Sequence, residues 1–434
     1  MSKRFSLARQ VLWASLPLVA ALFADQAQAV PSYARQTGQD CAACHIGAFG
    51  PQLTPFGIKF KLGGYVDSDG KGGKIPLSAM VVADYSRYKP QDPDTGTFGD
   101  KETKSGIAEA SVFLAGKLTD HIGSFVQVTN SGIDHTTSFD QMDLRVTTNL
   151  NMGDKEALVG VSVNNNPTVQ DPFNTLSTWG FPYTGSDRLS YPGSELASGS
   201  LEHRVIGVNA YTLIDDSIYA ELGLYNTLSP AMQSRMGQGR FNSDAADPGT
   251  PFGSLSNAPY WRLAYTKDLH TSAWHVGLMG YDGKVEDRVS TDSVKFKDIG
   301  VDGSYTFLGN RQHICTLNAS YLREHTNTVS EADGDSSDTT KDLRLSTSYH
   351  YMNTYGATFG YVKSSSKSKE TGNRAFIYQL DWTPWGKESS WNAPWANVRL
   401  GAQYVAFKSD IATEANGGKA SDLNSLRLFA WTSF

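Results

Sequence analysis

The sequence predicts an all-β protein: a closed barrel of about sixteen strands that crosses a membrane, preceded by a small segment of a different kind. Short segments that alternate apolar and polar residues recur along most of the chain, and short and long connections alternate between them. Glycine and aromatic residues are abundant, with 41 Gly, 20 Tyr, 20 Phe and 9 Trp, while hydrophobic residues make up only 39%. After the leader, no apolar run reaches the roughly 18 residues that a membrane-spanning helix needs, which excludes a helical membrane protein.

The first 29 residues have the pattern of a secretory signal peptide. Lys3, Arg4 and Arg9 form a basic start, an apolar run covers 11–24, and Ala27-Gln28-Ala29 is a cleavage site of the small-x-small kind. We therefore expect residues 1–29 to be removed and the mature chain to lie outside the bacterial inner membrane.

The strands are predicted from alternation with a period of two. In the stretch WRLAYT, Trp261, Leu263 and Tyr265 fall on one face of a strand, and Arg262 and Thr266 fall on the other. Strands with one apolar face and one polar face suit a barrel wall that has lipid outside and water inside. The same pattern predicts sixteen strands, near 77–89, 105–117, 121–130, 140–150, 155–165, 202–214, 217–227, 259–268, 272–282, 296–307, 311–324, 340–352, 355–366, 373–384, 395–408 and 423–434.

An even number of strands with short turns on one side and longer loops on the other predicts an outer-membrane barrel over 76–434. A closed barrel is the β-structure that satisfies every backbone group in lipid. Both ends of the barrel then lie on the periplasmic side, and sixteen strands leave an open lumen. The alternative is a soluble β-sandwich or propeller, which would bury its aromatic face.

Residues 30–75 do not alternate and are expected to form a separate unit. Thr54 and Pro55 predict the start of a short helix, and Gly63-Gly64 predicts its end. So short a segment buries little core by itself. We expect it to fold around a cofactor and against the barrel, as a plug in the lumen.

The motif that carries chemistry is Cys-x-x-Cys-His, at Cys41, Cys44 and His45. This is the attachment pattern of c-type haem, in which two thiols add to the porphyrin and the histidine binds iron. A thioredoxin-like redox pair would need a βαβ context, and a zinc site would need two further ligands nearby. Neither is present, so the sequence predicts one covalently attached haem c.

Two longer stretches give the motif a family context. "PSYARQTGQDCAACH" and "QLTPFGIKFKLGGY" resemble the start of the fused outer-membrane monohaem cytochrome–porins, which include iron oxidases. "WANVRLGAQY" and "ASDLNSLRLFAWTSF" are similar to the family's closing strands. Ile58 departs from the pattern, because the family usually has arginine there.

The resemblance implies that Cys41 and Cys44 are the thioether positions and that His45 is the proximal iron ligand. Arg35, Lys59 and Lys61 are candidates to neutralise the haem propionates, or else they are solvated surface cations.

The sixth iron ligand must come from the barrel or be water, because no His or Met lies between His45 and Met80. Strand phase points His275 and His350 into the lumen, so these are the candidate distal ligands, with Met279 deeper. His313 and Cys315 fall on the outward face.

We expect an electron-transfer protein that passes electrons from an extracellular donor, Fe(II) for this family, to a soluble periplasmic cytochrome. Such a chain could be described as an Fe(II):cytochrome c oxidoreductase. The formal net charge of −6 argues against nucleic acid as a partner. Two predicted extracellular loops carry carboxylates suited to iron or calcium, at Asp92, Asp94, Asp100 and Glu102 and at Glu331, Asp333, Asp335 and Asp338. The alternative is that these are ordinary solvated porin loops. The alternatives are a conduit for another donor or acceptor, and a porin whose haem unit is a structural or sensing plug.

Overall fold

The computed structural model describes residues 31–92, 96–132, 135–153, 155–184, 201–202, 204–236, 254–286, 292–330, 334–368, 371–390 and 395–434. The predicted signal peptide, 1–29, lies outside these residues. No helix within the described ranges is long and apolar enough to cross a membrane.

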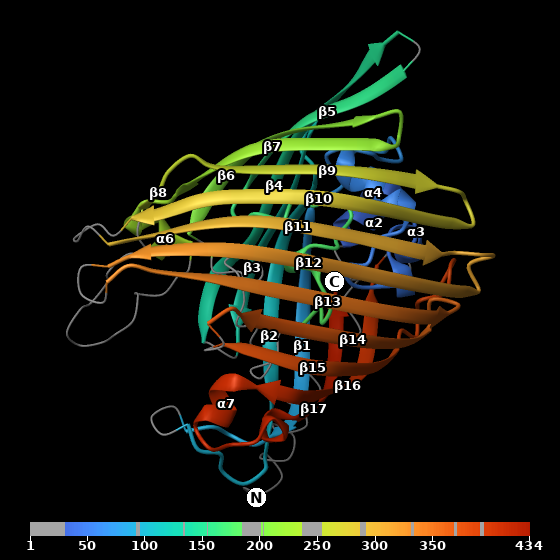
Figure 1. Cartoon of the computed structure of the whole chain (residues 1–434). Coiled ribbons are helices and arrows are strands. Elements are labelled where there is room, and N and C mark those ends of the chain that lie inside the picture. The colour runs from blue at the N-terminus through green and yellow to red at the C-terminus, as the bar shows by residue number, and fades with distance from the viewer. Residues whose placement is uncertain are drawn as a thin grey trace, which may run out of the picture.

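The described strands form one antiparallel sheet that closes on itself (Figure 1). Each long strand pairs with its neighbours in chain order, and the last strand pairs with the first, with Met80 opposite Ser433. The sixteen long strands are β1 (Leu77–Tyr88), β2 (Glu102–Lys117), β3 (Ile122–Ser131), β4 (Thr136–Met152), β5 (Lys155–Asn164), β6 (Val205–Ile214), β7 (Ile218–Thr227), β9 (Ala258–Asp268), β10 (Ser272–Glu286), β11 (Ser293–Phe307), β12 (His313–Val329), β13 (Ser336–Tyr351), β14 (Tyr355–Ser366), β15 (Gly372–Trp382), β16 (Asn397–Asp410) and β17 (Ser425–Ser433). A two-residue strand, β8 (Ser254–Leu255), pairs with the end of β10.

The prediction of a closed barrel of about sixteen strands is confirmed, and each of the sixteen predicted segments overlaps one long strand. Alternation predicted the facing of the side chains as well. On β10, Val276 and Leu278 are exposed while His275 and Met279 are buried. Outward apolar and inward polar residues therefore follow the two-residue period of a strand.

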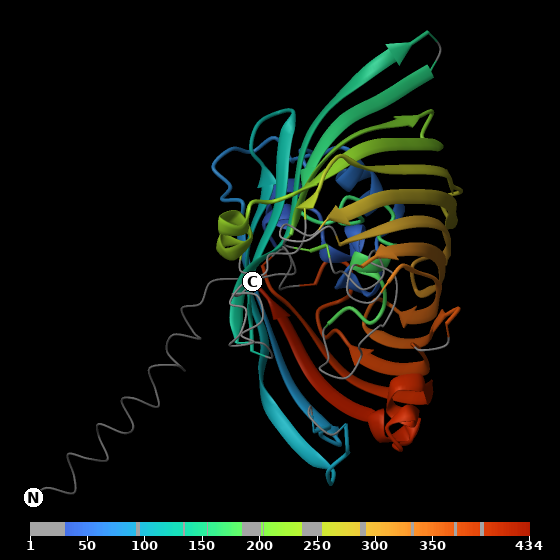
Figure 2. The same cartoon turned by 60° about the vertical axis from the view of Figure 1, so that its left-hand side comes forward.

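The N-terminal unit, residues 31–76, contains three short helices, α2 (Pro31–Thr37), α3 (Cys41–Cys44) and α4 (Pro55–Leu62), and the 3₁₀ turn η1 (Ile46–Ala48). The predicted limits of the helix after Thr54 are confirmed: the Thr54 side chain accepts a hydrogen bond from Gly57 N, and the helix ends at Leu62, before Gly63. The unit lies among the strands at the short-turn end, where the blue helices are enclosed in Figures 1 and 2.

The segment after β5 also turns into the barrel. We call residues 165–184 the inner loop; it includes the 3₁₀ turn η2 (Ser177–Trp179), and most of its residues from Asn165 to Phe173 are almost fully buried. Together the inner loop and the N-terminal unit occupy part of the lumen that the strand count alone led us to expect open. The other described helical segments, α6 (Pro230–Arg235), α7 (Ile411–Ala415) and η3 (Ala420–Leu423), lie in the longer connections.

Candidate functional site

The Cys-x-x-Cys-His motif is held in place by the start of the helix that follows it. Cys41 to Cys44 form the single turn α3, and His45 leaves it in an extended conformation and pairs with Leu53. Thr54 N donates to Cys44 O at 2.9 Å. A Cβ atom at Gly57 would come within 2.3 Å of Cys44 O, so the close packing of α4 on the motif requires glycine there. The motif is therefore a fixed element and not an exposed loop.

The two cysteines and the histidine line one cavity inside the barrel, of about 560 Å³, which we call the motif cavity. Its volume lies within the range of about 300–1,000 Å³ typical of sites for small molecules and cofactors. Aromatic residues from several elements form much of its wall; these include Tyr33, Phe49, Phe60, Phe113, Phe125, Trp179, Tyr183 and Trp431. Such a wall would suit a large flat apolar ligand.

Three polar atoms of residues that line the motif cavity are buried without a hydrogen-bond partner. They are Nδ1 of His45, Nε1 of Trp431 and Oγ of Ser433. Buried polar groups in folded proteins are almost always bonded, so each of these three atoms is an exception that a bound group or an ordered water would explain.

The protonation states of the two cysteines do not fit a redox dithiol. Burial raises the pKa of Cys41 and of Cys44 to about 12, so both side chains are neutral thiols at neutral pH. Reactive redox cysteines have lowered pKa values. Burial also lowers the pKa of His45 to about 4, which keeps the imidazole neutral and able to bind iron. Among the described residues, no three His, Cys, Asp or Glu side chains group in a way that could hold a metal ion by themselves.

Of the three cations expected near the propionates, only Lys61 lines the motif cavity. Lys59 forms an exposed ion pair with Asp216 at 2.8 Å. Arg35 donates to Leu77 O at the start of β1 and lies 5.9 Å from the Trp395 ring. The structure therefore brings Lys61 together with the motif and leaves Arg35 and Lys59 outside the cavity wall.

The two histidines expected as distal ligands point inward, and neither lines the motif cavity. His350 lies close to the turn that follows the motif, because a Cβ atom added to Gly47 would be 2.6 Å from His350 Nε2. Both ring nitrogens of His350 are buried without a hydrogen-bond partner. His275 has both ring nitrogens engaged: Nε2 is 3.0 Å from Asp302 Oδ2, and Nδ1 is 2.8 Å from Ser304 Oγ.

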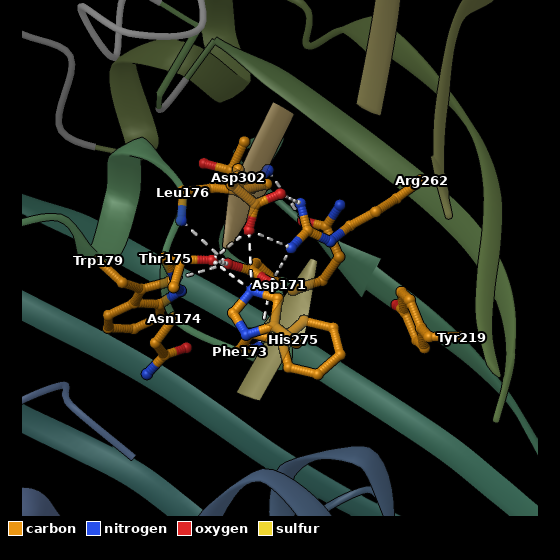
Figure 3. A network of polar contacts seen from close by, with 12 residues as sticks. Asp171, Phe173, Asn174, Thr175, Leu176, Trp179, Tyr219, Arg262, His275 and Asp302 are labelled. Carbon is orange, nitrogen blue, oxygen red and sulfur yellow. Dashed lines mark hydrogen bonds and ion pairs between the residues drawn. The ribbon is translucent and has the colours of Figure 1, made fainter. Parts of the chain in front are cut away.

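His275 belongs to a buried polar network that fixes the inner loop to the wall (Figure 3). The Arg262 guanidinium is 2.8 Å from Asp302 and 3.2 Å from Asp171 of the inner loop. Thr175 of the same loop donates to Asp302 at 2.5 Å. Inner-loop Asp171 thus meets a wall cation on β9, and the side chains of all three charged groups are fully buried.

The inner loop is in turn bonded to the N-terminal unit. Lys61 Nζ donates to Val169 O and to Asn174 Oδ1, both at 2.8 Å, and Asn174 Nδ2 donates to Pro51 O at 2.8 Å. Arg145 on β4 donates to the carbonyls of Lys61 and Gln170. The motif, the inner loop and the wall are therefore one bonded assembly.

Several residues of the site were not predicted from the sequence. The motif cavity is also lined by Met80 and Trp431 of the closing strands, by Arg344, and by the three carboxylates Glu109, Asp140 and Glu202. A signal for the inner loop was present: Phe173, Trp179 and Phe181 are unusual in a long connection between strands.

The acidic loops are described only in part. Asp94, Glu331 and Asp333 lie outside the described residues. Asp338 accepts hydrogen bonds from Ser368 N and Oγ at 3.0 and 2.9 Å, so this carboxylate stabilises a neighbouring loop.

No family model and no curated protein matches the chain. Similar solved structures include the outer membrane channel DcaP of Acinetobacter baumannii, 12% identical over 85% of this chain and 99% of its own, with a TM-score of 0.49. OmpT of Vibrio cholerae is 13% identical over 84% of this chain and 98% of its own (TM-score 0.44). The anion-selective porin from Comamonas acidovorans is 13% identical over 82% and 98% (TM-score 0.43). At such low identity these neighbours assign neither a ligand nor an activity to this chain.

Proposed function

We propose that this protein is an outer-membrane electron-transfer protein that carries one haem c on Cys41 and Cys44. Its donor is extracellular Fe(II), and its acceptor is a soluble periplasmic cytochrome or a similar carrier. The observation that carries the proposal is that both thiols and His45 line a cavity inside a closed barrel. The outward face of that barrel suits lipid, because it exposes large apolar side chains such as Leu222 and Leu380.

The residues of the chain have separate tasks in this proposal. Cys41 and Cys44 would hold the haem through two thioether bonds, each formed by addition of S–H across a vinyl group, which needs no oxidant. His45 would supply a neutral nitrogen to the iron. Lys61 supplies the charge in the wall that a propionate would neutralise, and the aromatic wall excludes water. A bound c-type haem supplies the one-electron chemistry, which none of these side chains provides.

The place of the motif in the barrel supports a role across the membrane. The hydrocarbon layer is about 30 Å thick, and a carrier held inside the wall leaves less of that distance uncovered than one held below the barrel. Arg145 and Asn397 bond the N-terminal unit to the inner wall: Arg145 donates to Lys61 O at 3.1 Å, and Asn397 donates to Ala48 O at 2.7 Å. The same bonds argue against a freely open solute channel.

An anaerobic titration of the oxidised full-length protein with Fe(II), followed by absorption, tests the proposal. We expect covalent haem in the wild type and in the Cys315→Ser control. Fe(II) should reduce this haem, which is seen as a change in its absorption bands. The Cys41→Ser/Cys44→Ser variant is expected to hold no covalent haem. Wild-type protein purified without covalent haem from cells that attach haem c to other proteins would overturn the proposal.

The two alternatives give different results in the same preparations. A haem that is attached but is not reduced by Fe(II) at acid or neutral pH, and is reduced by another donor, indicates a conduit for that donor. A haem-independent passage of small neutral solutes through liposomes indicates a porin with a structural or sensing plug.

A further inference from the structure

One strand residue places a soft metal ligand in the motif cavity. Met80 is on the inward face of β1, is 8% exposed, and lines the cavity together with Cys41, Cys44 and His45. Among the described residues of that lining, Met80 is the only methionine and His45 the only histidine. Met279 and His275 line other cavities in the barrel.

Met80 is bracketed by contacts that tie the N-terminal unit to the same strand. Two residues earlier on the same face, Ser78 Oγ accepts from Ser32 N at 3.1 Å and lies 2.9 Å from Ser32 Oγ. Residues i and i+2 of a strand point to one side, so α2 is bonded directly beside Met80.

The other side of Met80 is fixed by the segment that follows the motif. Phe49 packs edge-on against Trp431 of β17, with ring centroids 4.8 Å apart. Trp431 is paired with Val82, and Met80 with Ser433, in the β1–β17 register. Met80, Phe49, Phe60 and Trp431 belong to one buried apolar cluster. The thioether is thus held in the wall on which the residues flanking the motif pack.

The chemistry of a thioether suits this position. The Met sulfur is neutral, has no proton to lose, and can be buried in an apolar wall without the desolvation penalty of a charge. Methionine with histidine is a known axial pair in cytochromes c, and it raises the reduction potential. A haem with a higher reduction potential accepts electrons more readily from a weakly reducing donor.

We propose that Met80 is the sixth iron ligand of the haem that Cys41, Cys44 and His45 hold. This rests on the proposed haem attachment and adds to it a ligand contributed by the barrel. His275 then keeps its structural role in the inner-loop network. His350, whose two ring nitrogens are buried without a hydrogen-bond partner, packs against Gly47.

Absorption, ligand-binding and potentiometric measurements on full-length haem-loaded proteins test this assignment. The ferric wild type should show the weak long-wavelength sulfur-to-iron charge-transfer band. Met80→Leu should lose that band, bind carbon monoxide rapidly in the ferrous state, and have a lower midpoint potential. Met279→Leu is the matched control, since it removes an inward, buried methionine of β10 from a different apolar cluster, and it should keep the band.

A second variant covers the case in which Met80→Leu does not fold. Met80→His should give a low-spin haem with two nitrogen ligands, no sulfur band and a lower potential than the wild type. The proposal is wrong if the wild type carries covalent haem but lacks the sulfur band, or if the band survives in either Met80 variant. A wild type without covalent haem would instead refute the haem attachment itself.

Discussion

Lys61 is a residue whose chemistry is strongly altered by its position. Its ammonium group is buried 4.6 Å from the centre of the Trp179 ring, and burial lowers its pKa to about 7. A negative group placed beside such a lysine would strongly stabilise its charged form. Lys61 also links the N-terminal unit to the inner loop through Val169 O and Asn174.

The pKa of Lys61 gives a prediction about stability in the haem-free Cys41→Ser/Cys44→Ser variant. Between about pH 7 and the ordinary lysine value of 10.5, the folded protein holds fewer protons on Lys61 than the unfolded chain. Stability should therefore rise with pH across this window, by at most ~1.4 kcal/mol per pH unit from this residue. Lys61→Met in the same background should lack that contribution.

Thermal unfolding in detergent, followed by circular dichroism at pH 7 and pH 10, measures the difference between the two proteins. The exposed Lys59→Met is the matched control and should behave as its parent does. Equal responses to pH in the Lys61→Met variant and its parent would contradict the low pKa.

At the residue scale, the sequence was informative where the chemistry is local. Cys41, Cys44 and His45 are predictable because their spacing alone defines the motif. Met80, Trp431 and Ser433 were not predicted as parts of the site, because they join it only when β1 pairs with β17, and these strands lie at opposite ends of the barrel sequence. For the same reason strand phase could show that His275 points inward, while its partner Asp302 depended on the fold.

At the scale of the elements, the strands were predictable and the inner loop was not. Each strand carries its own two-residue alternation, for which the rest of the chain is not needed. The inner loop has no such period. Its buried position depends on Arg262 of β9 and Asp302 of β11, which supply partners for Asp171 and Thr175. Local sequence contains no information about partners so distant in the chain.

The inner loop should lose its anchor in an Arg262→Leu variant. The substitution leaves Asp171 and Asp302 buried and facing each other without the cation, and breaking a buried ion pair costs about 3–5 kcal/mol. We expect a clearly lower unfolding temperature in detergent and faster proteolysis within 165–184. Lys284→Ala, which removes an exposed pair with Glu286, should change the unfolding temperature little. Equal effects of the two substitutions would show that the network does not hold the loop.

At the scale of the whole molecule, bonded segments cross the lumen of the barrel. Electron transfer can proceed through a filled lumen, whereas passage of solutes requires an open one. Proteoliposomes with a soluble c-type cytochrome inside and Fe(II) outside distinguish these functions. The wild type should reduce the enclosed cytochrome without admitting a small neutral sugar. The Cys41→Ser/Cys44→Ser variant should neither reduce the cytochrome nor admit the sugar. Sugar entry together with haem-independent reduction inside would support the porin alternative.

The closing seam between β1 and β17 bears on the order of assembly. Met80 comes from the first strand of the barrel, and Trp431 and Ser433 come from the last. The N-terminal unit directly precedes the first strand. Pairing of these two strands completes the wall of the motif cavity, in which the proposed haem would lie. Under the proposed function, covalent attachment of haem in the periplasm is therefore expected to precede closure of the barrel in the outer membrane.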